Sequence, residues 1–245
     1  MIRRLADSFR RADFGTLLLE LIVVVVGILL ALGVDTWWDS RAEEDLKREY
    51  LRSLHDSLQQ DLAFMDDRIL PEIELRIETS EHLKQVTPDT VPVTLEDQRD
   101  FVMDINRAGY FAVFRPQRSV IDDLVATGNL RLIDDAALRR SLLDYYERAD
   151  NWAPYDEFAR DLIWRKFRNE GTGFIPLEAV HMSKEGRAAA PVESMVAIVE
   201  SEVFQRGLLN VGFMANWYKQ RYENERDALV ELIETVGQAV ASAEG

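Results

Sequence analysis

The 245-residue chain contains no cysteine and only three histidines. The absence of cysteine excludes disulfide bonds, thiol catalysis and thiolate metal sites. The histidines, His55, His82 and His181, are too widely spaced for a local metal-binding pair, and no carboxylate-x-x-His motif repeats as a di-iron bundle requires. We therefore expect no cofactor and no metal ion, and we expect the fold to be stabilised by packing alone.

The chain also lacks the motifs of the common enzyme classes. It contains no Gly-x-Ser-x-Gly, and the Gly171-Thr172-Gly173 stretch is not followed by the Gly-Lys-Ser/Thr of a phosphate-binding loop. No nucleophile has a base that the sequence places beside it. We therefore predict that the protein is not an enzyme.

Sustained apolar-polar alternation, the pattern of β-strands, is missing as well. Instead, apolar residues recur at steps of three and four after position 45, at Leu46, Tyr50, Leu54, Leu58, Leu62, Met65 and Ile69. No glycine or proline interrupts the chain between Val34 and Leu70. The sequence therefore predicts an all-α protein, built as a bundle of long helices.

Positive charge is scarce outside the N-terminus. The formal net charge is −15, of which the first fourteen residues contribute +2 and the remainder −17. A domain this acidic repels the phosphates of nucleic acids and anionic lipid headgroups. We therefore expect no nucleic-acid partner.

One long apolar run, FGTLLLELIVVVVGILLALGV at residues 14–34, dominates the N-terminal region. Its 21 residues give a helix of ~32 Å, which is long enough to cross a bilayer core. We predict a transmembrane helix that continues into the bundle, with the lipid bilayer as its partner. Arg10 and Arg11 before the run, and Trp37 and Trp38 after it, are assigned to the two membrane interfaces. For the tryptophans, an aromatic belt is favoured over a ligand-stacking pair.

The charge asymmetry around this run predicts its orientation. The arginines precede the span and acidic residues follow it, which places the N-terminus in the cytoplasm of a bacterium and the C-terminal domain in the periplasm. We divide the chain into a cytoplasmic segment (1–13), a transmembrane helix (14–34) in the bacterial inner membrane and an extracytoplasmic helical domain (35–245). The alternative is a signal peptide cleaved near Ala31-Leu32-Gly33. A retained anchor is favoured because helix-forming sequence runs straight through that point.

Further helices are expected after this region. Pro71 should kink the long helix, which resumes over Glu72–Gln85. Thr94, with an aspartate three residues later, is typical of a helix start and predicts a helix over Leu95–Arg107. The aromatic stretch Gly109–Phe114 fits either a strand or a loop.

In the C-terminal half, Asp134 is expected to cap a helix, and Pro154 to restart or kink it. Three glycines and two prolines predict the longest loop at 170–191. A last helical region follows, with Gly207 and Gly212 as its weak points. The predicted core consists of Leu54, Leu58, Leu62, Leu124, Leu130, Ile133, Leu142, Tyr146, Trp164, Trp217 and Ile233.

Two stretches, LELIVVVVGILLALGVDTWWDSR and RPQRSVIDDLVATGNLRLIDDAALRRSLLDYYERADNW, carry a family resemblance. They resemble an uncharacterised family of bacterial single-pass membrane proteins, a domain of unknown function. The shared positions are Glu20, Gly27-Ile28, Trp38, Leu124, Thr127, Gly128, Asn129, Leu130, Ile133 and Tyr145-Tyr146. Asp35 departs from the family pattern, which has an amide-rich stretch before the tryptophan. The resemblance implies the same topology with a single ectodomain, and it implies no activity.

A carboxylate lies within the span. Glu20 is about six residues, or ~9 Å, from its cytoplasmic end, where a carboxylate normally pairs or faces protein. Glu20, Val24, Gly27 and Ala31 lie on one side of the helix, and Gly27-x-x-x-Ala31 is a small-xxx-small pattern. We call these four residues the span stripe and predict that they form a helix–helix interface. The alternative is a glutamate that snorkels or is protonated.

Arginines gather in the second of the two stretches that carry the resemblance, at Arg115, Arg118, Arg131, Arg139 and Arg140. A cluster of guanidinium groups is able to bind a carboxylate ligand or an acidic partner. Ion pairs on helix surfaces are the simpler interpretation, and we favour them.

These observations favour a membrane-anchored helical interaction module, an accessory or scaffold subunit of a bacterial envelope or membrane-protein complex. Its partner would be another membrane protein, or a second copy in a homo-oligomer, bound through the span. The alternative is an extracytoplasmic ligand-binding sensor domain. Against a sensor stands the short cytoplasmic segment, which offers no output domain.

Overall fold

The computed structural model describes residues 13–162 and 189–244 of the chain. These residues form helices joined by short connections, and no strand occurs among them. The prediction of an all-α fold is confirmed. The helices are α2 (Asp13–Phe64), the π-helical turn η1 (Met65–Ile69), α3 (Leu70–Gln85), α4 (Leu95–Ala108), α5 (Ser119–Ala126), the 3-10 turn η2 (Asn129–Leu132), α6 (Ala136–Leu162), α8 (Val192–Glu200) and α9 (Glu202–Glu244).

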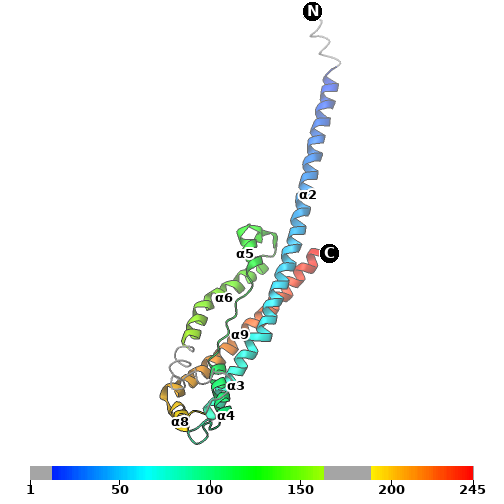
Figure 1. Cartoon of the computed structure of the whole chain (residues 1–245). Coiled ribbons are helices and arrows are strands. Elements are labelled where there is room, and N and C mark those ends of the chain that lie inside the picture. Colours follow the sequence, from blue (N-terminus) through cyan, green and yellow to red (C-terminus); the bar gives the residue numbers. More distant parts are fainter. Residues whose placement is uncertain (1–12, 163–188, 245) are drawn as a thin grey trace, which may run out of the picture.

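The first three elements, α2, η1 and α3, follow one another without a gap and form a single long rod. Its N-terminal part projects far beyond the rest of the molecule, and its C-terminal part runs through the helical domain (Figure 1). The expected continuation of the apolar helix into the bundle is confirmed. By length and composition, this is the one helix among the described residues that is able to cross a membrane.

The rod does not end at Pro71 because a π-helical turn precedes it. Proline lacks the N–H of a regular helical hydrogen bond, and its ring crowds the preceding turn. In η1 the Leu70 N–H donates to the Met65 carbonyl, five residues back, and this wider turn places Pro71 at the start of α3. The local irregularity predicted at Pro71 is therefore a π turn at 65–69, a known site of helix distortion.

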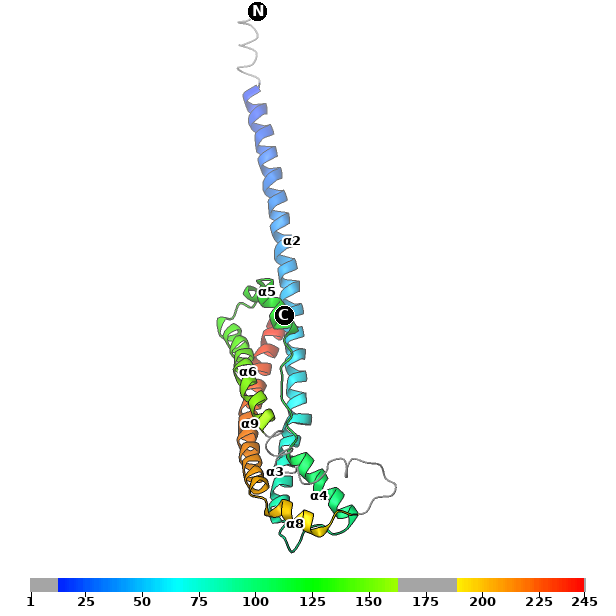
Figure 2. The same cartoon turned by 60° about the vertical axis from the view of Figure 1, so that its left-hand side comes forward.

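Helix α9 packs antiparallel along the rod (Figure 2). Three ion pairs between the rod and α9 agree with this antiparallel arrangement: Arg52 with Glu244, Asp66 with Arg226, and Glu74 with Lys219. Side chains of α3 pack against α9 at Gly212, where a Cβ atom would lie 3.0 Å from Lys84 Nζ and 3.3 Å from Ser80 Oγ. The glycine is therefore a packing position inside α9. The predicted weak points, Gly207 and Gly212, are wrong, since the break lies at Ser201 between α8 and α9.

The core lies between the rod, α9 and the helices that cover them. Of the predicted core residues, Leu54, Leu58, Leu124, Ile133, Leu142 and Tyr146 are buried. Leu62, Leu130 and Ile233 are partly buried and pack against the core, while Trp164 lies outside the described residues. These burials follow the three-and-four spacing that the sequence contains.

Trp217 contradicts its predicted place in the core, because 43% of it is exposed. The neighbouring positions Ala215 and Tyr218 face inward on α9 instead. Trp217 packs edge-to-face on Trp152 of α6, with ring centroids 5.5 Å apart. Helical spacing alone does not distinguish these two faces of α9, since both carry large apolar residues.

The remaining connections position the segments around the core. The Thr94 side chain caps α4 by accepting from the Asp97 N–H, as predicted. Residues 110–118 have no regular structure, which decides the ambiguous stretch 109–114 in favour of a loop. Helix α6 is capped by Asp135, whose Oδ1 accepts from the backbone N–H groups of Ala137 and Leu138. The predicted cap at Asp134 is thus one residue off, and Pro154 lies inside α6 without ending it.

Candidate functional site

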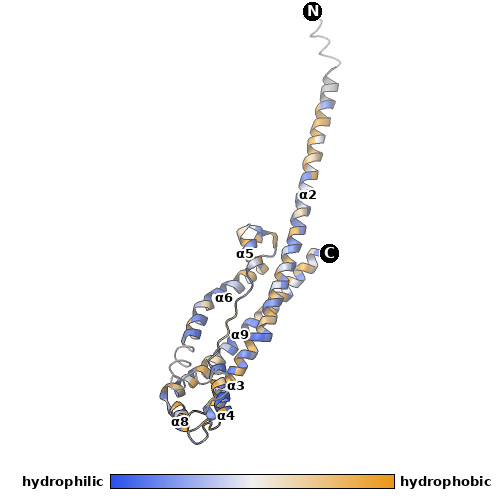
Figure 3. Ribbon diagram, viewed as in Figure 1, coloured by the Kyte–Doolittle hydropathy of each residue, from blue (hydrophilic) through white to orange (hydrophobic). Residues whose placement is uncertain are grey.

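The span stripe lies on the part of α2 that projects from the domain. Residues 19–45 are all exposed, and nothing lies within 4 Å of the Cβ position at Gly27. Hydrophobic colours predominate in the upper part of the projecting helix in Figure 3. Within this chain, the described residues therefore provide no partner for Glu20, Val24 or Ala31, and their predicted role in a helix–helix interface stays a prediction.

The tryptophan pair follows the apolar run directly. Trp37 and Trp38 are each 61% exposed, and their rings meet edge-to-face with centroids 5.2 Å apart. This position fits an aromatic belt at a membrane surface, which stays a prediction. Arg10 and Arg11, assigned to the other interface, lie outside the described residues.

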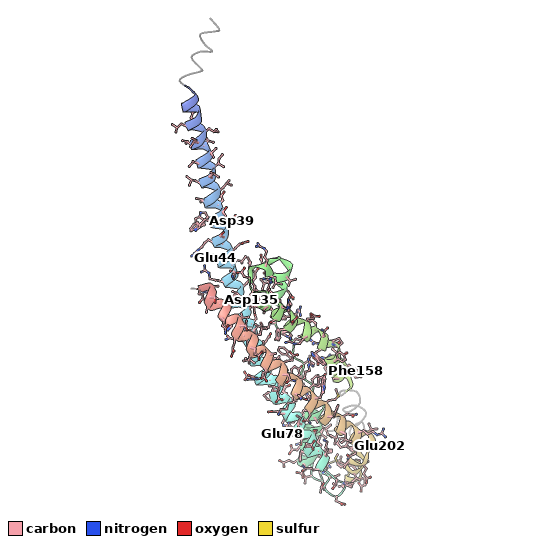
Figure 4. All side chains as sticks on the ribbon, turned by 180° about the vertical axis from the view of Figure 1, so that it is seen from behind. Asp39, Glu44, Glu78, Asp135, Phe158 and Glu202 are labelled. Carbon is pink, nitrogen blue, oxygen red and sulfur yellow. The ribbon has the colours of Figure 1, made fainter. Side chains whose placement is uncertain are left out.

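The domain begins only a short distance beyond the tryptophans. Its nearest contacts with α2 are the ion pair of Glu43 with Arg131, at 2.7 Å, and that of Lys47 with Asp134. Asp39 and Glu44 mark the intervening stretch of helix in Figure 4. Glu43 follows Trp38 by five positions, which corresponds to about 7.5 Å along a helix. The free apolar helix is therefore joined to the domain by little more than one helical turn.

The arginines of the second block contact acidic residues on several different elements. Arg118 pairs with Asp150 at 2.8 Å, and Arg131 with Glu43 at 2.7 Å. Arg115 lies farther from its partners Asp156 and Glu157, at 3.9 and 3.8 Å. The ion-pair interpretation is confirmed for these three arginines. Arg139 instead donates to the backbone carbonyl oxygens of residues 133 and 134.

The histidines do not come together in the part of the chain that the structure describes. His82 Nδ1 lies 2.9 Å from Asp104 Oδ2, whereas His55 approaches Gly237 of α9. Within the same described ranges, no three His, Asp or Glu side chains are grouped as metal ligands. His181 lies outside these ranges.

A buried carboxylate that the sequence did not reveal joins three elements. Asp61 of α2 is 2% exposed. Its carboxylate accepts hydrogen bonds from the Gln117 backbone N–H, at 3.0 Å, and from the Tyr145 hydroxyl of α6, at 2.9 Å. Burial raises the pKa of Asp61 to about 6, although both hydrogen bonds act in the opposite direction. A carboxyl group with such a pKa, beside a groove, is a candidate functional group.

A second unexpected group is the buried guanidinium of Arg76 in α3. Arg76 is 1% exposed, and its three nitrogen atoms have no hydrogen-bond partner among the described residues. The guanidinium carbon lies 4.7 Å from the centroid of the Phe111 ring. Burial lowers the pKa of Arg76 to about 10, with Glu72 acting against this shift. The favourable contact is therefore a cation–π interaction inside the core.

Arg221 of α9 makes a related contact at the edge of the core. It pairs with the buried Asp156 at 2.6 Å, and its guanidinium lies 4.4 Å from the Trp152 ring and 4.8 Å from the Tyr222 ring. Both arginines thus pack on aromatic rings, Arg76 joining α3 to the segment 110–118 and Arg221 joining α9 to α6. For Arg76 a sequence signal exists, because it continues the core spacing of Ile69 and Ile73.

The family model of a family of unknown function, DUF6090, matches residues 20–164. The matched stretch begins in the free part of α2 and ends just beyond α6, so it includes both regions on which the resemblance rests. The comparisons with curated proteins and with solved structures gave no match. Because the family model covers more than half of the chain, the protein belongs to the DUF6090 family of unknown function.

Proposed function

We propose that this protein is a membrane-anchored interaction module with no catalytic role, an accessory or scaffold subunit of a bacterial envelope complex. Residues 14–34 would cross the inner membrane, residues 1–13 would lie in the cytoplasm and residues 35–245 in the periplasm. The observation that carries the proposal is the free apolar part of α2, which continues without a break into the core of the domain.

The exposed apolar run supports the membrane anchor. Its side chains are between 45% and 66% exposed from Leu19 to Val34, apart from the small residues and Glu20. Apolar surface of this extent is unfavourable in water and marks an interaction site on a protein surface. A bilayer supplies apolar surroundings on all sides of the helix at once.

Helix geometry supports a partner on one side of the rod. Leu54 and Leu58 follow Gly27 and Ala31 by 7.5 helical turns, which places them roughly 180° away around the helix axis. These leucines face the core, where α9 packs. The span stripe would therefore lie on the side of the rod that faces away from the domain. A partner helix is able to approach that side without meeting α9.

The composition of the stripe supports close helix packing. A lipid-facing Glu20 loses solvation that lipid cannot replace, whereas a second helix offers a hydroxyl, an amide or a backbone group. Gly27 and Ala31 allow the two backbones to approach closely. The net charge of −15 opposes self-association of the domain. A different membrane protein is therefore favoured over a homo-oligomer.

Disulfide crosslinking in native membranes tests this proposal, and the lack of native cysteine makes single-cysteine variants unambiguous. Cysteines at Glu20, Val24, Gly27 and Ala31 should crosslink to a partner, whereas cysteines at Ile22 and Leu29, on the opposite side, should not. Gly27→Leu should abolish the crosslinks from position 24. Gly33→Leu is the matched control, since Gly33 also has open space around it but lies off the stripe. Equal crosslinking on all sides would contradict the proposal.

A further inference from the structure

A groove with a volume of about 560 Å³ lies between the π-helical turn and the irregular segment 110–118. We call it the π-turn groove. One wall comes from the end of α2 and from η1, where residues 60, 64, 67 and 68 share a side of the helix. The other wall comes from Phe114, Arg115 and Gln117. π-Helical turns inside α-helices occur frequently at functional sites.

The middle of the π-turn groove is apolar. Phe64 is 46% exposed and lies with its ring centroid 6.3 Å from that of Phe114. Phe114 is almost fully buried and packs in turn against Tyr222 of α9. Phe114 is therefore held by the core, whereas Phe64 presents much of its ring to the groove.

Two guanidinium groups line the same groove. Arg115 makes only two long ion pairs among the described residues, at 3.9 and 3.8 Å, which are beyond hydrogen-bonding distance. Arg68 is exposed and lies 3.2 Å from Glu72. A guanidinium group presents paired N–H donors that match the two oxygen atoms of a carboxylate. None of the Arg115 donors lies within hydrogen-bonding distance of a carboxylate among the described residues.

Two acidic residues, Asp61 and Asp67, also line the groove. The Asp61 carboxylate is directed to Gln117 and Tyr145 by its hydrogen bonds. Asp67 is exposed in η1 and offers an acceptor for an ammonium group beside the two arginines. The groove thus combines donors for a carboxylate, an aromatic wall and one acceptor.

We propose that the π-turn groove binds a small carboxylate with an apolar or aromatic body. The carboxylate would accept hydrogen bonds from Arg115 and Arg68, and the body would pack on Phe64 and Phe114. A free aromatic acid and an aromatic amino acid share this chemistry, and the second would also place its ammonium group near Asp67. The proposal stands apart from the proposed contact of the span, because the two sites lie on different parts of the molecule.

Isothermal titration calorimetry on the full chain in lipid nanodiscs tests this site. The probes are 3-phenylpropionate, L-phenylalanine and phenethylamine, which carry the carboxylate alone, both groups and the ammonium group alone. We expect at least one of the two acids to bind saturably and phenethylamine to bind at least tenfold more weakly. Binding of L-phenylalanine alone would identify the amino acid as the source of the carboxylate.

Two matched variants locate the site. Arg115→Gln should weaken binding of the acid about tenfold to a hundredfold, as expected for the loss of a charged hydrogen-bonding partner. Arg131→Gln removes another exposed arginine outside the groove and should leave binding unchanged. Phe64→Ala, at a half-exposed position, should weaken binding while the far-ultraviolet circular dichroism stays native. No saturable binding of either acid, equal effects of the two arginine variants, or equal binding of phenethylamine would overturn the proposal.

Discussion

The two ends of the same rod differ in what surrounds them. From Leu19 to Val34 the helix is apolar on every side and entirely exposed. From position 46 onward, only one side is apolar, and Leu51, Leu54 and Leu58 on that side are buried against the domain. A helix that is apolar all round needs apolar surroundings on all sides, whereas a helix with one apolar stripe needs a single packing partner. One continuous helix therefore passes between two different environments.

The continuity of the helix backbone and the burial of its side chains therefore have different causes. Helix formation from Asp13 to Gln85 requires only local hydrogen bonds and the absence of breakers, with η1 accommodating Pro71. Burial is decided by what lies around each turn. Because the helix does not break, the orientation of the span stripe is coupled directly to the position of the domain.

The largest expected effect comes from a matched pair of leucines on the two parts of the rod. Leu54→Ala removes a fully buried side chain and should reduce the free energy of unfolding of the domain by roughly 2–5 kcal/mol. Leu29→Ala, in the exposed apolar run, should change it by less than about 0.5 kcal/mol. Chemical denaturation of the full chain in nanodiscs, followed by tryptophan fluorescence, measures both. Equal losses of unfolding free energy in the two variants would show that the exposed and buried parts of the rod do not differ in environment.

The next effect concerns pH and the buried Asp61. Its pKa in the folded state is raised to about 6, so the folded protein binds a proton more readily than the unfolded chain. The stability contributed by this group is present below about pH 4 and is lost as the pH rises through 6. Between pH 4 and pH 7 this loss should amount to roughly 2 kcal/mol.

Asp61→Asn isolates this contribution. The unfolding free energy of the wild-type chain minus that of Asp61→Asn should fall with rising pH over this range. Asp67→Asn, at an exposed carboxylate in η1, provides the control for the removal of one carboxylate. If the difference in unfolding free energy between wild type and Asp61→Asn stayed constant over this pH range, the raised pKa of Asp61 would be contradicted.

A comparable effect is expected at Arg76, the buried charge of the packed region. Its guanidinium has lost solvation and has no hydrogen-bond partner among the described residues, and an apolar side chain of similar length does not carry this cost. Arg76→Met should therefore stabilise the domain by roughly 1–3 kcal/mol, and Arg68→Met, at an exposed position, should stay within about 0.5 kcal/mol of wild type. Thermal unfolding of the wild type, Arg76→Met and Arg68→Met measures these changes in stability. A large destabilisation by Arg76→Met would contradict this prediction. It would show that the contact with Phe111 outweighs the cost of burying the guanidinium group.

The sequence predicted the elements that depend on local signals. The unbroken spacing from Leu46 to Ile69 predicted the long helix, and Thr94 predicted the start of α4. Local signals did not separate Asp134 from Asp135 as the cap of α6, since the two differ only in which carboxylate reaches the free N–H groups. Local signals also did not reveal the π turn, because a proline at position 71 indicates a kink and a π turn alike.

Long-range contacts explain what sequence reasoning missed. Gly212 is required by its approach to α3, more than a hundred residues away in the sequence, and Asp61 is buried by Tyr145 and Gln117 from other elements. Trp217 is exposed because Tyr218 takes the inward position beside it. The span stripe stays a prediction for a related reason: no helix among the described residues packs against it.

The membrane anchor is tested most directly by the sidedness of the two ends of the chain in intact bacteria. We would place single cysteines at Ser8, before the apolar run, and at Ser141, on the exposed side of α6, and label them with a membrane-impermeant maleimide. We predict that position 141 is labelled once the outer membrane is permeable, whereas position 8 is labelled only after the inner membrane is disrupted. Labelling of both positions from outside, or protection of position 141, would contradict the proposed topology.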